Sequence, residues 1–219
     1  MDVFQTSGCV ISYRTREAAN QDGELSHRIQ IPAFTIKKGD RLAIIGPSGS
    51  GKSTFSTLVL GETLDATITG EWTTNTGKCA WVGQDHFGNL NPRVTVARHL
   101  ELAGAPRTEV PALLEKVQLP VEYSGRFPSQ LSGGERARVA LAICFAAKPS
   151  LLCIDELTSS FDTETTLEIL RIIKSIAGEL TVLFITHDHA AAHYLCDTVL
   201  SFSADGVAQY YPSWEAAHA

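Results

Sequence analysis

Three short and largely apolar runs along the chain predict buried strands of a parallel sheet. They cover residues 42–45 (LAII), 151–154 (LLCI) and 180–185 (LTVLFI). Runs of this length are typical of strands that are covered on both faces. Apolar residues also recur at helical spacing, as at Ile169, Ile172, Ile173 and Ile176. The pattern predicts an alternating α/β core, in which the isoleucine stripe is interpreted as packing and not as a cofactor site.

The N-terminal part shows a different, β-rich pattern. Residues 8–13, 28–36 and 41–45 are predicted strands, and the polar stretch from Thr15 to Leu25 is a predicted loop. Lys37-Lys38-Gly39-Asp40 predicts a turn. Further on, residues 67–74 and 79–83 read as strands joined by Asn75-Thr76-Gly77, which together predict a β-hairpin.

Strand signal is weak from about residue 88 to residue 142, which predicts a helical insert. Val110, Leu113, Leu114 and Val117 follow the i, i+3, i+4, i+7 pattern of one helix, and Thr108 is its predicted cap. Leu131-Ser132-Gly133-Gly134-Glu135 opens a longer helix to about Ala147. Its serine and glutamate have the spacing of a capping box. Taken alone, this pentapeptide is best interpreted as a well-capped helix start.

A glycine-rich loop follows the strand at 41–45 and precedes a helix predicted to run from Lys52 to near Gly61. Its sequence is Gly46-Pro47-Ser48-Gly49-Ser50-Gly51-Lys52-Ser53-Thr54. The order strand, loop, helix fits G-x-x-x-x-G-K-[ST], in which backbone N–H groups and the helix N-terminus surround phosphate oxygens. The sequence therefore predicts a site for the phosphates of a nucleotide.

Two carboxylates, Asp155 and Glu156, follow the buried run at 151–154. Ionised carboxylates are costly to desolvate unless they are paired or bind a metal, so a solvated strand end and a Mg²⁺ site are the competing interpretations. The phosphate loop in the same chain favours Mg²⁺. His189 and His193 are spaced like metal ligands, but no third ligand has suitable spacing, so a metal site there is disfavoured.

Net charge, apolar runs and cysteine spacing argue against several classes of protein. The chain has 219 residues and a net charge of −6, which gives no overall electrostatic case for binding nucleic acid or an anionic membrane. The longest uncharged apolar run, residues 139–147, is far shorter than the ~20 residues that span a bilayer, and no signal-peptide pattern is expected at the N-terminus. Five widely spaced cysteines indicate reduced, cytosolic thiols.

Six features together resemble the nucleotide-binding domain of ATP-binding-cassette (ABC) transporters. They are GPSGSGKS at 46–53, Gln84, LSGGE at 131–135, LLCIDE at 151–156, SSFD at 159–162 and His187. The resemblance implies one ABC ATPase domain over residues 1–219. Its fold would be a P-loop NTPase (RecA-like) α/β core with a mostly parallel sheet, an N-terminal antiparallel β subdomain and a helical subdomain at about 88–142. Residues 84–96 are similar, more narrowly, to the peptide and nickel importer branch.

The resemblance also implies ATP and Mg²⁺ as cofactors. Lys52 and the loop backbone would hold the phosphates, through Gly46, Pro47, Ser48, Gly49, Ser50, Gly51, Ser53 and Thr54. Mg²⁺ would be surrounded by Ser53, Gln84 and Asp155. Glu156 would orient or deprotonate the attacking water, and His187 would contact the γ-phosphate. Tyr13 matches the adenine-stacking aromatic by position, although its spacing alone favours a strand residue packed in a sheet.

Dimerisation is a further implication. In the family the signature LSGGE closes on ATP that is held by a second copy, in a head-to-tail dimer. Ser132, Gly133 and Gly134 would then bind the neighbour's nucleotide, and Asp162, also a predicted helix cap, would belong to the same site. Three departures stand out: Leu157 replaces a usual proline, Ser160-Phe161 replaces Ala-Leu, and residues 201–219 lack the usual ending.

The predicted function is that of an ATPase subunit that drives separate transmembrane permease subunits from the cytoplasmic face of the membrane. The second cassette of its dimer would be an identical or a different chain. The alternative is a soluble ABC-type ATPase that acts on nucleic acid or ribosomes. Such proteins usually carry two cassettes or a long coiled-coil insertion, and this sequence has neither. Direct binding of nucleic acid is therefore not expected. The third hypothesis is a nucleotide-sensing interaction module that hydrolyses little ATP.

Overall fold

The computed structural model describes residues 1–14, 25–83, 90–157, 161–176 and 180–217. The chain separates into two compact units, one formed by Met1–Thr76 with Leu183–Ala219 and the other by Gly77–Val182. The polypeptide therefore leaves the first unit after Thr76 and returns to it within the strand β8 (Thr181–Ile185).

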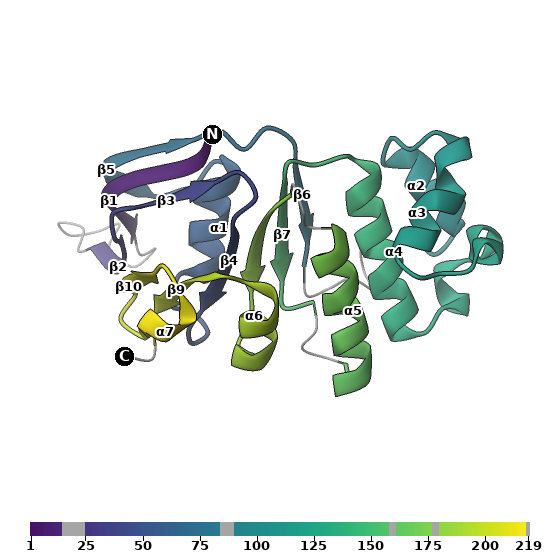
Figure 1. The fold of residues 1–219 in the computed structure, drawn as a ribbon. Helices are drawn as coiled ribbons and strands as arrows, with labels where there is room; N and C mark the ends of the chain where they lie inside the picture. Colours follow the sequence, from purple (N-terminus) through teal and green to yellow (C-terminus); the bar gives the residue numbers. More distant parts are fainter. Residues whose placement is uncertain (15–24, 84–89, 158–160, 177–179, 218–219) are drawn as a thin grey trace. The chain divides into compact units, whose positions relative to one another are not determined.

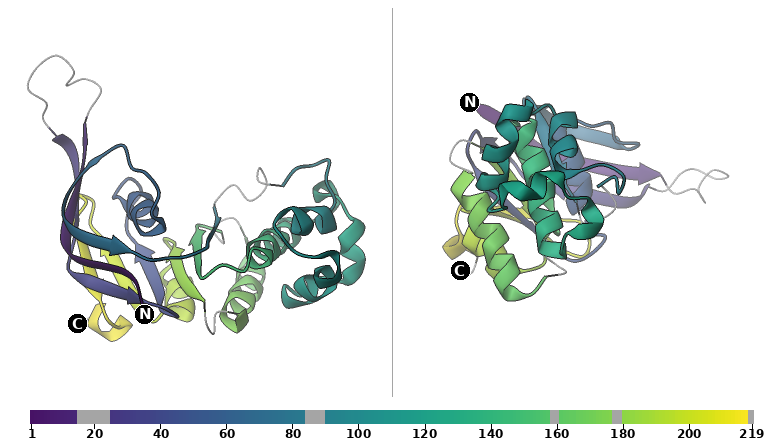
Figure 2. Two further views of the ribbon diagram at one scale, coloured as in Figure 1. Left: turned by 90° about the horizontal axis from the view of Figure 1, so that it is seen from above. Right: turned by 90° about the vertical axis from the view of Figure 1, so that its right-hand side faces the viewer.

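An antiparallel sheet built around β1 (Asp2–Arg14) forms one part of the first unit (Figure 1 and Figure 2). β2 (Leu25–Ile31) and β3 (Phe34–Lys37) pair with one edge of β1, and β5 (Thr67–Thr74) pairs with the other. This arrangement confirms the predicted N-terminal β subdomain. The predicted strand at 28–36 is wrong in one respect: it is two strands, which separate at Pro32, a residue without an N–H for a ladder.

Parallel strands form the other part of the first unit. β4 (Arg41–Ile45) pairs in parallel with β9 (Thr198–Phe202), and β10 (Ala208–Tyr211) is antiparallel to β9. The strand order here is β10-β9-β4-β8. The helices of this unit are α1 (Lys52–Leu60), α6 (His189–Leu195) and α7 (Trp214–Ala217).

The helix α1 begins and ends as the sequence predicts. Its C-cap, Gly61, is left-handed, with φ of 73°, and its N–H closes the last turn. Phe55, on the buried face of α1, contacts the rings of Phe4 and Phe202, with centroids 5.6 Å and 6.2 Å away. One buried aromatic side chain thus holds α1 against strands of both sheets of this unit.

The second unit combines two parallel strands with helices. β6 (Cys79–Val82) pairs in parallel with β7 (Leu151–Asp155). The helices are α2 (Val96–Leu102), α3 (Val110–Lys116), α4 (Gly133–Ala146) and α5 (Thr163–Ile176), with 3₁₀ turns η2 (Arg107–Glu109), η3 (Val121–Gly125) and η4 (Pro128–Gln130). α2 and α3 both pack on α4 (Figure 2). The described residues between 90 and 142 contain no strand, as the pattern predicts.

The predicted hairpin at residues 67–83 is wrong. Its two strands exist, but β5 pairs with β1 in the first unit, whereas β6 pairs with β7 in the second. The connection Asn75-Thr76-Gly77 is the point at which the chain passes from one unit to the other. A turn-like sequence between two strands does not specify their partners, because each strand pairs where its side chains find a packed sheet.

The predicted cap of α3 is also wrong, although its buried face is right. Thr108 lies within the 3₁₀ turn η2, and the N-cap position of α3 is Glu109, which makes no side-chain capping bond. The predicted stripe of Val110, Leu113, Leu114 and Val117 is buried. Packing of this stripe therefore stabilises a helix whose start lacks a cap.

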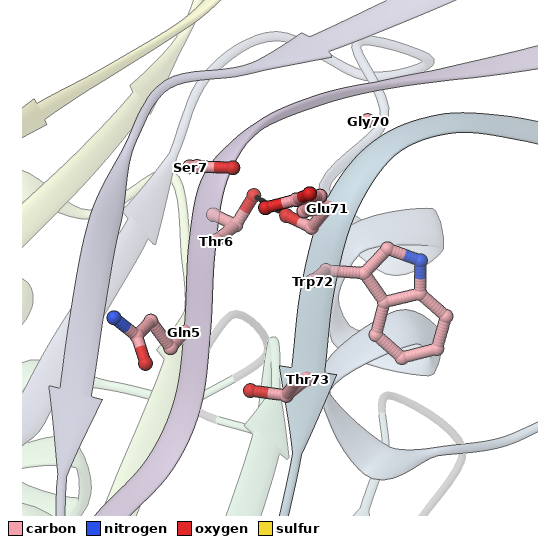
Figure 3. Close-up of a pocket in the computed structure, with 7 residues that line it drawn as sticks. All are labelled: Gln5, Thr6, Ser7, Gly70, Glu71, Trp72 and Thr73. Carbon is pink, nitrogen blue, oxygen red and sulfur yellow. Dashed lines mark hydrogen bonds between the residues drawn. The ribbon is translucent and has the colours of Figure 1, made fainter.

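A shallow hollow of about 500 Å³ lies over β1 and β5 (Figure 3). The hydroxyl of Thr6 donates to the carbonyl of Glu71, and the register of the two strands shifts between Thr6 and Gly8. The hollow follows from this irregularity, since a bulge re-aims side chains on either side of it. None of the predicted site residues lines it.

Within the described part of the chain, every helix is too short or too polar to cross a bilayer. The five cysteines, all of them within the described residues, form no disulfide, and only Cys79 is exposed. Burial raises the pKa of the Cys144 thiol to about 12, so this thiol stays protonated near neutral pH.

Candidate active site

The glycine-rich loop between β4 and α1 is folded around the side chain of Lys52. The Lys52 Nζ donates to the carbonyls of Gly46, at 2.8 Å, and Pro47, at 2.7 Å. Lys52 is the first residue of α1 and is 8% exposed. A largely desolvated ammonium group at a helix N-terminus, where backbone N–H groups are also unsatisfied, is suited to bind an anion.

Ser50 supplies a second indication that the loop accommodates a ligand. Its hydroxyl oxygen is buried and has no hydrogen-bond partner in the described structure. A buried polar group without a partner costs about 1–3 kcal/mol, so native proteins rarely leave one unless a water or ligand supplies the bond. The loop thus offers a phosphate group two kinds of contact, the unpartnered hydroxyl of Ser50 and the positive charge of Lys52.

Two glycines of the loop have conformations or neighbours that a side chain would disturb. Gly46 has φ of 142°, and a Cβ there would lie 2.5 Å from the carbonyl oxygen of Phe202. Gly51, the N-cap of α1, has φ of 107°, and its Cβ would lie 2.7 Å from the buried Ile29 side chain. The close approach of the loop to β9 and β2 therefore requires glycine at both positions.

We expect Gly51→Ala to destabilise the protein by about 1–3 kcal/mol, because it adds a clash with Ile29 to the strain of positive φ. Gly49→Ala is the matched control: Gly49 also has positive φ, 77°, but nothing lies within 4 Å of its Cβ position. Urea unfolding of the two variants measures the difference. Equal losses would show that backbone strain alone, and not the contact with Ile29, accounts for the glycine.

Tyr13 lies beside the same loop. Its hydroxyl, near the end of β1, donates to Oγ1 of Thr54 at 3.1 Å, and its ring is half-buried. The sequence did not reveal this contact, because the two residues are 41 positions apart. The structure thus brings the predicted adenine-stacking residue next to the predicted phosphate loop, within one unit.

The predicted carboxylates end a buried strand, as expected. Leu151 to Ile154 are wholly buried in β7, whereas Asp155 and Glu156 are partly exposed where the strand ends. Glu156 has φ of 51°, an uncommon left-handed conformation for a residue other than glycine. Such backbone strain clusters at functional sites, where the surrounding packing must maintain it.

Leu157 is part of that packing. Its side chain is wholly buried. A residue before proline is pushed toward extended backbone, with negative φ, whereas Glu156 has φ of 51°. Leucine at 157 does not impose that restriction, and its buried side chain anchors the turn in the core.

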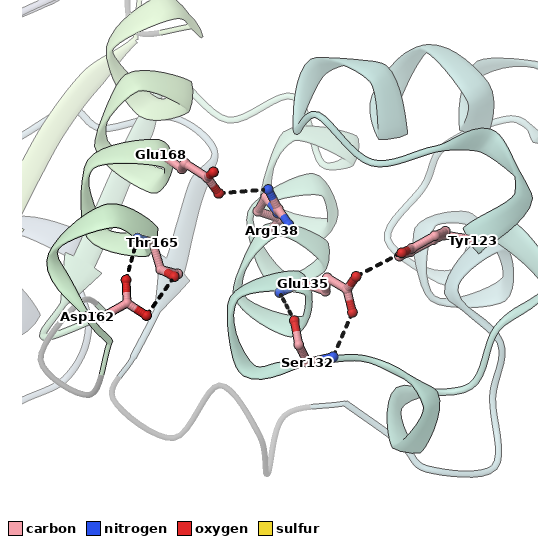
Figure 4. Close-up of polar contacts among 7 residues, drawn as sticks. All are labelled: Tyr123, Ser132, Glu135, Arg138, Asp162, Thr165 and Glu168. Atoms are coloured by element: carbon pink, nitrogen blue, oxygen red, sulfur yellow. Dashed lines mark hydrogen bonds and ion pairs between the residues drawn. The ribbon is translucent and has the colours of Figure 1, made fainter.

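The signature residues form the start of α4. The Ser132 hydroxyl accepts from the Glu135 N–H at 3.2 Å, and the Glu135 carboxylate accepts from the Ser132 N–H at 2.6 Å. The predicted capping box is therefore confirmed (Figure 4). Gly134 has a role that the sequence did not reveal: a Cβ there would lie 2.7 Å from the Thr165 methyl group, so glycine lets α5 approach α4.

Asp162 caps α5, as predicted. Its carboxylate accepts from the Thr165 N–H at 2.8 Å and from the Thr165 hydroxyl at 3.2 Å (Figure 4). These two bonds hold the pKa of Asp162 below its usual value, so the cap is ionised near neutral pH. Beside it, Arg138 of α4 forms an ion pair with Glu168 of α5 at 3.1 Å. The cap stabilises the start of α5, and the ion pair connects α5 to the signature helix.

His187 is exposed and is the second residue after β8, in the first unit. Asp188 follows it and caps α6 by accepting from the N–H groups of Ala190 and Ala191. His193 of α6 packs against Trp214, with ring centroids 5.1 Å apart. The described residues include no group of three or more His, Cys, Asp or Glu side chains that could hold a metal.

Some predicted features lie outside the described residues. They are Gln84 with the following residues 85–89 of the 84–96 segment, the 15–24 part of the predicted loop, and Ser159 and Ser160 of the SSFD segment. Among the described features, the phosphate loop, Tyr13 and His187 belong to the first unit, while Asp155, Glu156, the signature and Asp162 belong to the second. The roles assigned to these residues stay predictions.

Comparison with known proteins identifies the family. A family model described as ABC transporter matches residues 29–159. The chain belongs to the ABC transporter family. This result confirms the resemblance inferred from the motifs, and the mixed α/β fold with an antiparallel β subdomain agrees with it.

Curated ABC relatives include two methionine import ATP-binding proteins. MetN from Cupriavidus necator is 36% identical over 205 residues, covering 84% of this chain and 59% of the relative. MetN 1 from Rhodopseudomonas palustris is 37% identical over 190 residues, covering 76% and 50%. The chain thus matches only about half to six-tenths of the length of these relatives. The narrower resemblance to peptide and nickel importers stays a prediction.

Solved ABC structures share the fold. The dimeric structure of a bacterial ABC transporter cassette has a TM-score of 0.69 and 24% identity, covering 94% of this chain and 96% of that chain. A post-hydrolysis dimer bound to ADP and Pi has a TM-score of 0.70 and 24% identity, covering 95% and 97%. The P-loop NTPase fold predicted from the sequence is therefore confirmed.

Proposed function

We propose that this chain is the ATP-binding and ATP-hydrolysing subunit of an ABC transporter. The observation that carries the proposal is the loop at 46–54, in which Lys52 is held by two carbonyls beside the buried, unpartnered hydroxyl of Ser50. Membership of the ABC transporter family supports ATP as the nucleotide. The whole of residues 1–219 would be one ABC ATPase domain, with a helical subdomain at about 88–142.

The proposed chemistry is phosphoryl transfer to water, which depends on positioning and charge neutralisation. Lys52 and the loop backbone hold the phosphates of ATP, and Tyr13 stacks on the adenine. Glu156 orients the attacking water and accepts its proton, and His187 contacts the γ-phosphate. The exposed Ser53 hydroxyl, the Asp155 carboxylate and the Gln84 amide offer the oxygen ligands that Mg²⁺ prefers. When bound, Mg²⁺ supplies positive charge that offsets the charge of the phosphates.

Two further parts of the proposal concern partners. Ser132, Gly133, Gly134 and Asp162 would complete the ATP site of a second cassette in a head-to-tail dimer, identical or not. Separate permease subunits would hold the dimer at the cytoplasmic face of the membrane. The names of the curated relatives, which are import proteins, favour import as the direction. They do not extend to the substrate, because the proposed permease subunits, and not this chain, would contact it.

Co-purification tests the coupling to a membrane partner. We expect the tagged chain, recovered from detergent-solubilised membranes of its host, to bring down proteins with several membrane spans. Arg93→Ala should weaken this association several-fold while leaving basal ATPase of the isolated chain unchanged. Arg93 is exposed, and its N–H donates to the Asn91 side chain in the turn that precedes α2, so the substitution removes a surface cation and no core contact.

Arg171→Ala is the control, since Arg171 is an exposed arginine of the same unit on α5. Recovery of ribosomes or nucleic acid in place of membrane proteins would favour the soluble ATPase instead. Equal loss of association in both variants would show that the coupling surface has been misplaced.

A further inference from the structure

Glu135 presents an electrostatic problem in the signature helix. It is the acidic residue of the first turn of α4. In the proposed dimer this helix N-terminus approaches the phosphates of ATP on the second cassette, so its partial positive charge is useful there. A carboxylate in the same turn opposes that attraction unless its charge is offset. The inference below rests on the proposed function.

The carboxylate of Glu135 is fully engaged within its own unit. One oxygen accepts from the Tyr123 hydroxyl at 2.8 Å, and the other accepts from the Ser132 N–H at 2.6 Å. Figure 4 shows the side chains of Tyr123 and Glu135 pointing toward one another. Tyr123 comes from the 3₁₀ turn η3, twelve residues earlier in the chain. The bond therefore ties the signature to a separate part of the helical insert.

Arg126 completes this group. Its guanidinium carbon lies 3.5 Å from the centroid of the Tyr123 ring, a cation–π contact. Its backbone is fixed on both sides: the carbonyl accepts from the Val96 N–H and the N–H donates to the Tyr123 carbonyl, each at 2.9 Å. The backbone of Arg126 is thus fixed by α2 and η3, and the cation–π contact places its charge over the ring that bonds Glu135.

The carboxyl group of Glu135 is ionised near neutral pH. Burial raises the pKa of its carboxyl group, but the N–H of Ser132, the hydroxyls of Tyr123 and Ser132, and the charge of Arg126 together outweigh this and lower the pKa below its usual value. The signature helix therefore carries a negative charge in its first turn, and the positive charge of Arg126 stabilises it.

We propose that Tyr123 and Arg126 are positioning residues for the signature. Tyr123 holds the Glu135 carboxylate in the helix cap, and Arg126 offsets its charge, so that the N-terminus of α4 keeps its attraction for the ATP phosphates on the second cassette. The motif LSGGE does not itself offset the charge of Glu135, because Tyr123 and Arg126 both lie outside it.

A titration tests the network without any partner. The Glu135 carboxyl resonance is followed by NMR against pH in the wild type, in Arg126→Ala and in Tyr123→Phe. We expect the pKa of Glu135 to rise in both variants, since each removes a group that favours the charged form. Arg107→Ala is the control, an exposed arginine of the same unit whose loss changes the net charge equally. An unchanged pKa in both variants would overturn the proposal.

ATP-driven dimerisation tests the consequence. In a Glu156→Gln background, which is expected to trap ATP, Arg126→Ala should weaken the Mg-ATP-dependent dimer about tenfold, since one half-buried charge contributes a few-fold at each site and the dimer contains two such sites. The loss should shrink at high salt. Glu135→Gln preserves the capping box but removes the charge, so it should restore dimerisation of Arg126→Ala. A purely structural role of Arg126 would not be rescued in this way.

The outcomes separate the inference from the proposed function. If the Glu156→Gln protein dimerises with ATP and Arg126→Ala has no effect, the charge compensation is wrong. If the Glu156→Gln protein does not dimerise at all, the proposal that this chain forms a dimer with itself is wrong. The NMR titration then tests the effect of Tyr123 and Arg126 on Glu135 by itself.

Discussion

Glu156→Gln is expected to lower ATP hydrolysis by about 10²–10⁴-fold, because it removes the proposed proton acceptor for the attacking water. Glutamine has nearly the same size and the same backbone preference, so the left-handed turn at φ of 51° should persist. ATP binding should also persist, since Lys52 and the loop at 46–54 are unchanged. Steady-state phosphate release and nucleotide affinity, measured on the same preparation, check the two parts of this prediction.

The same variant should be monomeric without nucleotide and dimeric with Mg-ATP. Binding without turnover should favour the closed form by mass action, because in the proposed dimer ATP would contact the phosphate loop and the signature together only there. Size-exclusion chromatography at several protein concentrations measures the shift. Ser132→Arg is the control, since a bulky cation at the exposed N-cap of α4 should block closure.

Hydrolysis at nearly the wild-type rate would falsify the role of Glu156. An inactive variant that binds ATP but stays monomeric at high concentration would point to a second cassette of different sequence. This outcome is separable from misfolding, because circular dichroism and nucleotide affinity report directly on the folded monomer.

Lys52→Ala is expected to abolish hydrolysis and to weaken ATP binding by at least about a hundredfold. A charge-assisted contact between a largely buried ammonium and phosphate is among the stronger polar interactions in proteins. The side chain also ties the loop together, through the carbonyls of Gly46 and Pro47. Some loss of stability, about 1–2 kcal/mol, should therefore accompany the loss of affinity.

Lys52→Met separates the packing of the buried apolar stem from the ammonium group, because methionine retains most of the stem but lacks both the charge and the two bonds to the carbonyls. Both variants should lose ATP affinity, whereas Lys52→Met should retain more of the thermal stability. Nucleotide titration by fluorescence and thermal unfolding provide the readouts. Unchanged affinity in either variant would count against the loop as the phosphate site.

Features of this chain that depend on neighbours in sequence could be predicted without a structure. The helix from Lys52 to Leu60 with its Gly61 cap, the Ser132–Glu135 capping box and the buried strand before Asp155 all occur where the pattern places them. The family could be inferred as well, because its motifs are contiguous segments whose spacing is visible in the sequence.

Other features were decided by contacts between distant residues. β5 and β6 read as a hairpin but pair with different strands, because pairing energy depends on the packed surface that each strand meets. The bond from Tyr13 to Thr54 joins residues that carry no mutual signal in the sequence.

The candidate site shows the same division. The residue types at 46–54 predict phosphate chemistry by themselves, because local spacing determines a loop. The carboxylates at 155–156 predict a metal site only together with that loop. Only the folded chain leaves the Ser50 hydroxyl buried without a partner, turns Glu156 into a left-handed conformation and engages Glu135 with Tyr123. Burial, strain and long-range hydrogen bonds are properties of the packed structure, so the sequence determined the chemistry of this protein and its tertiary structure decided the environment of each group.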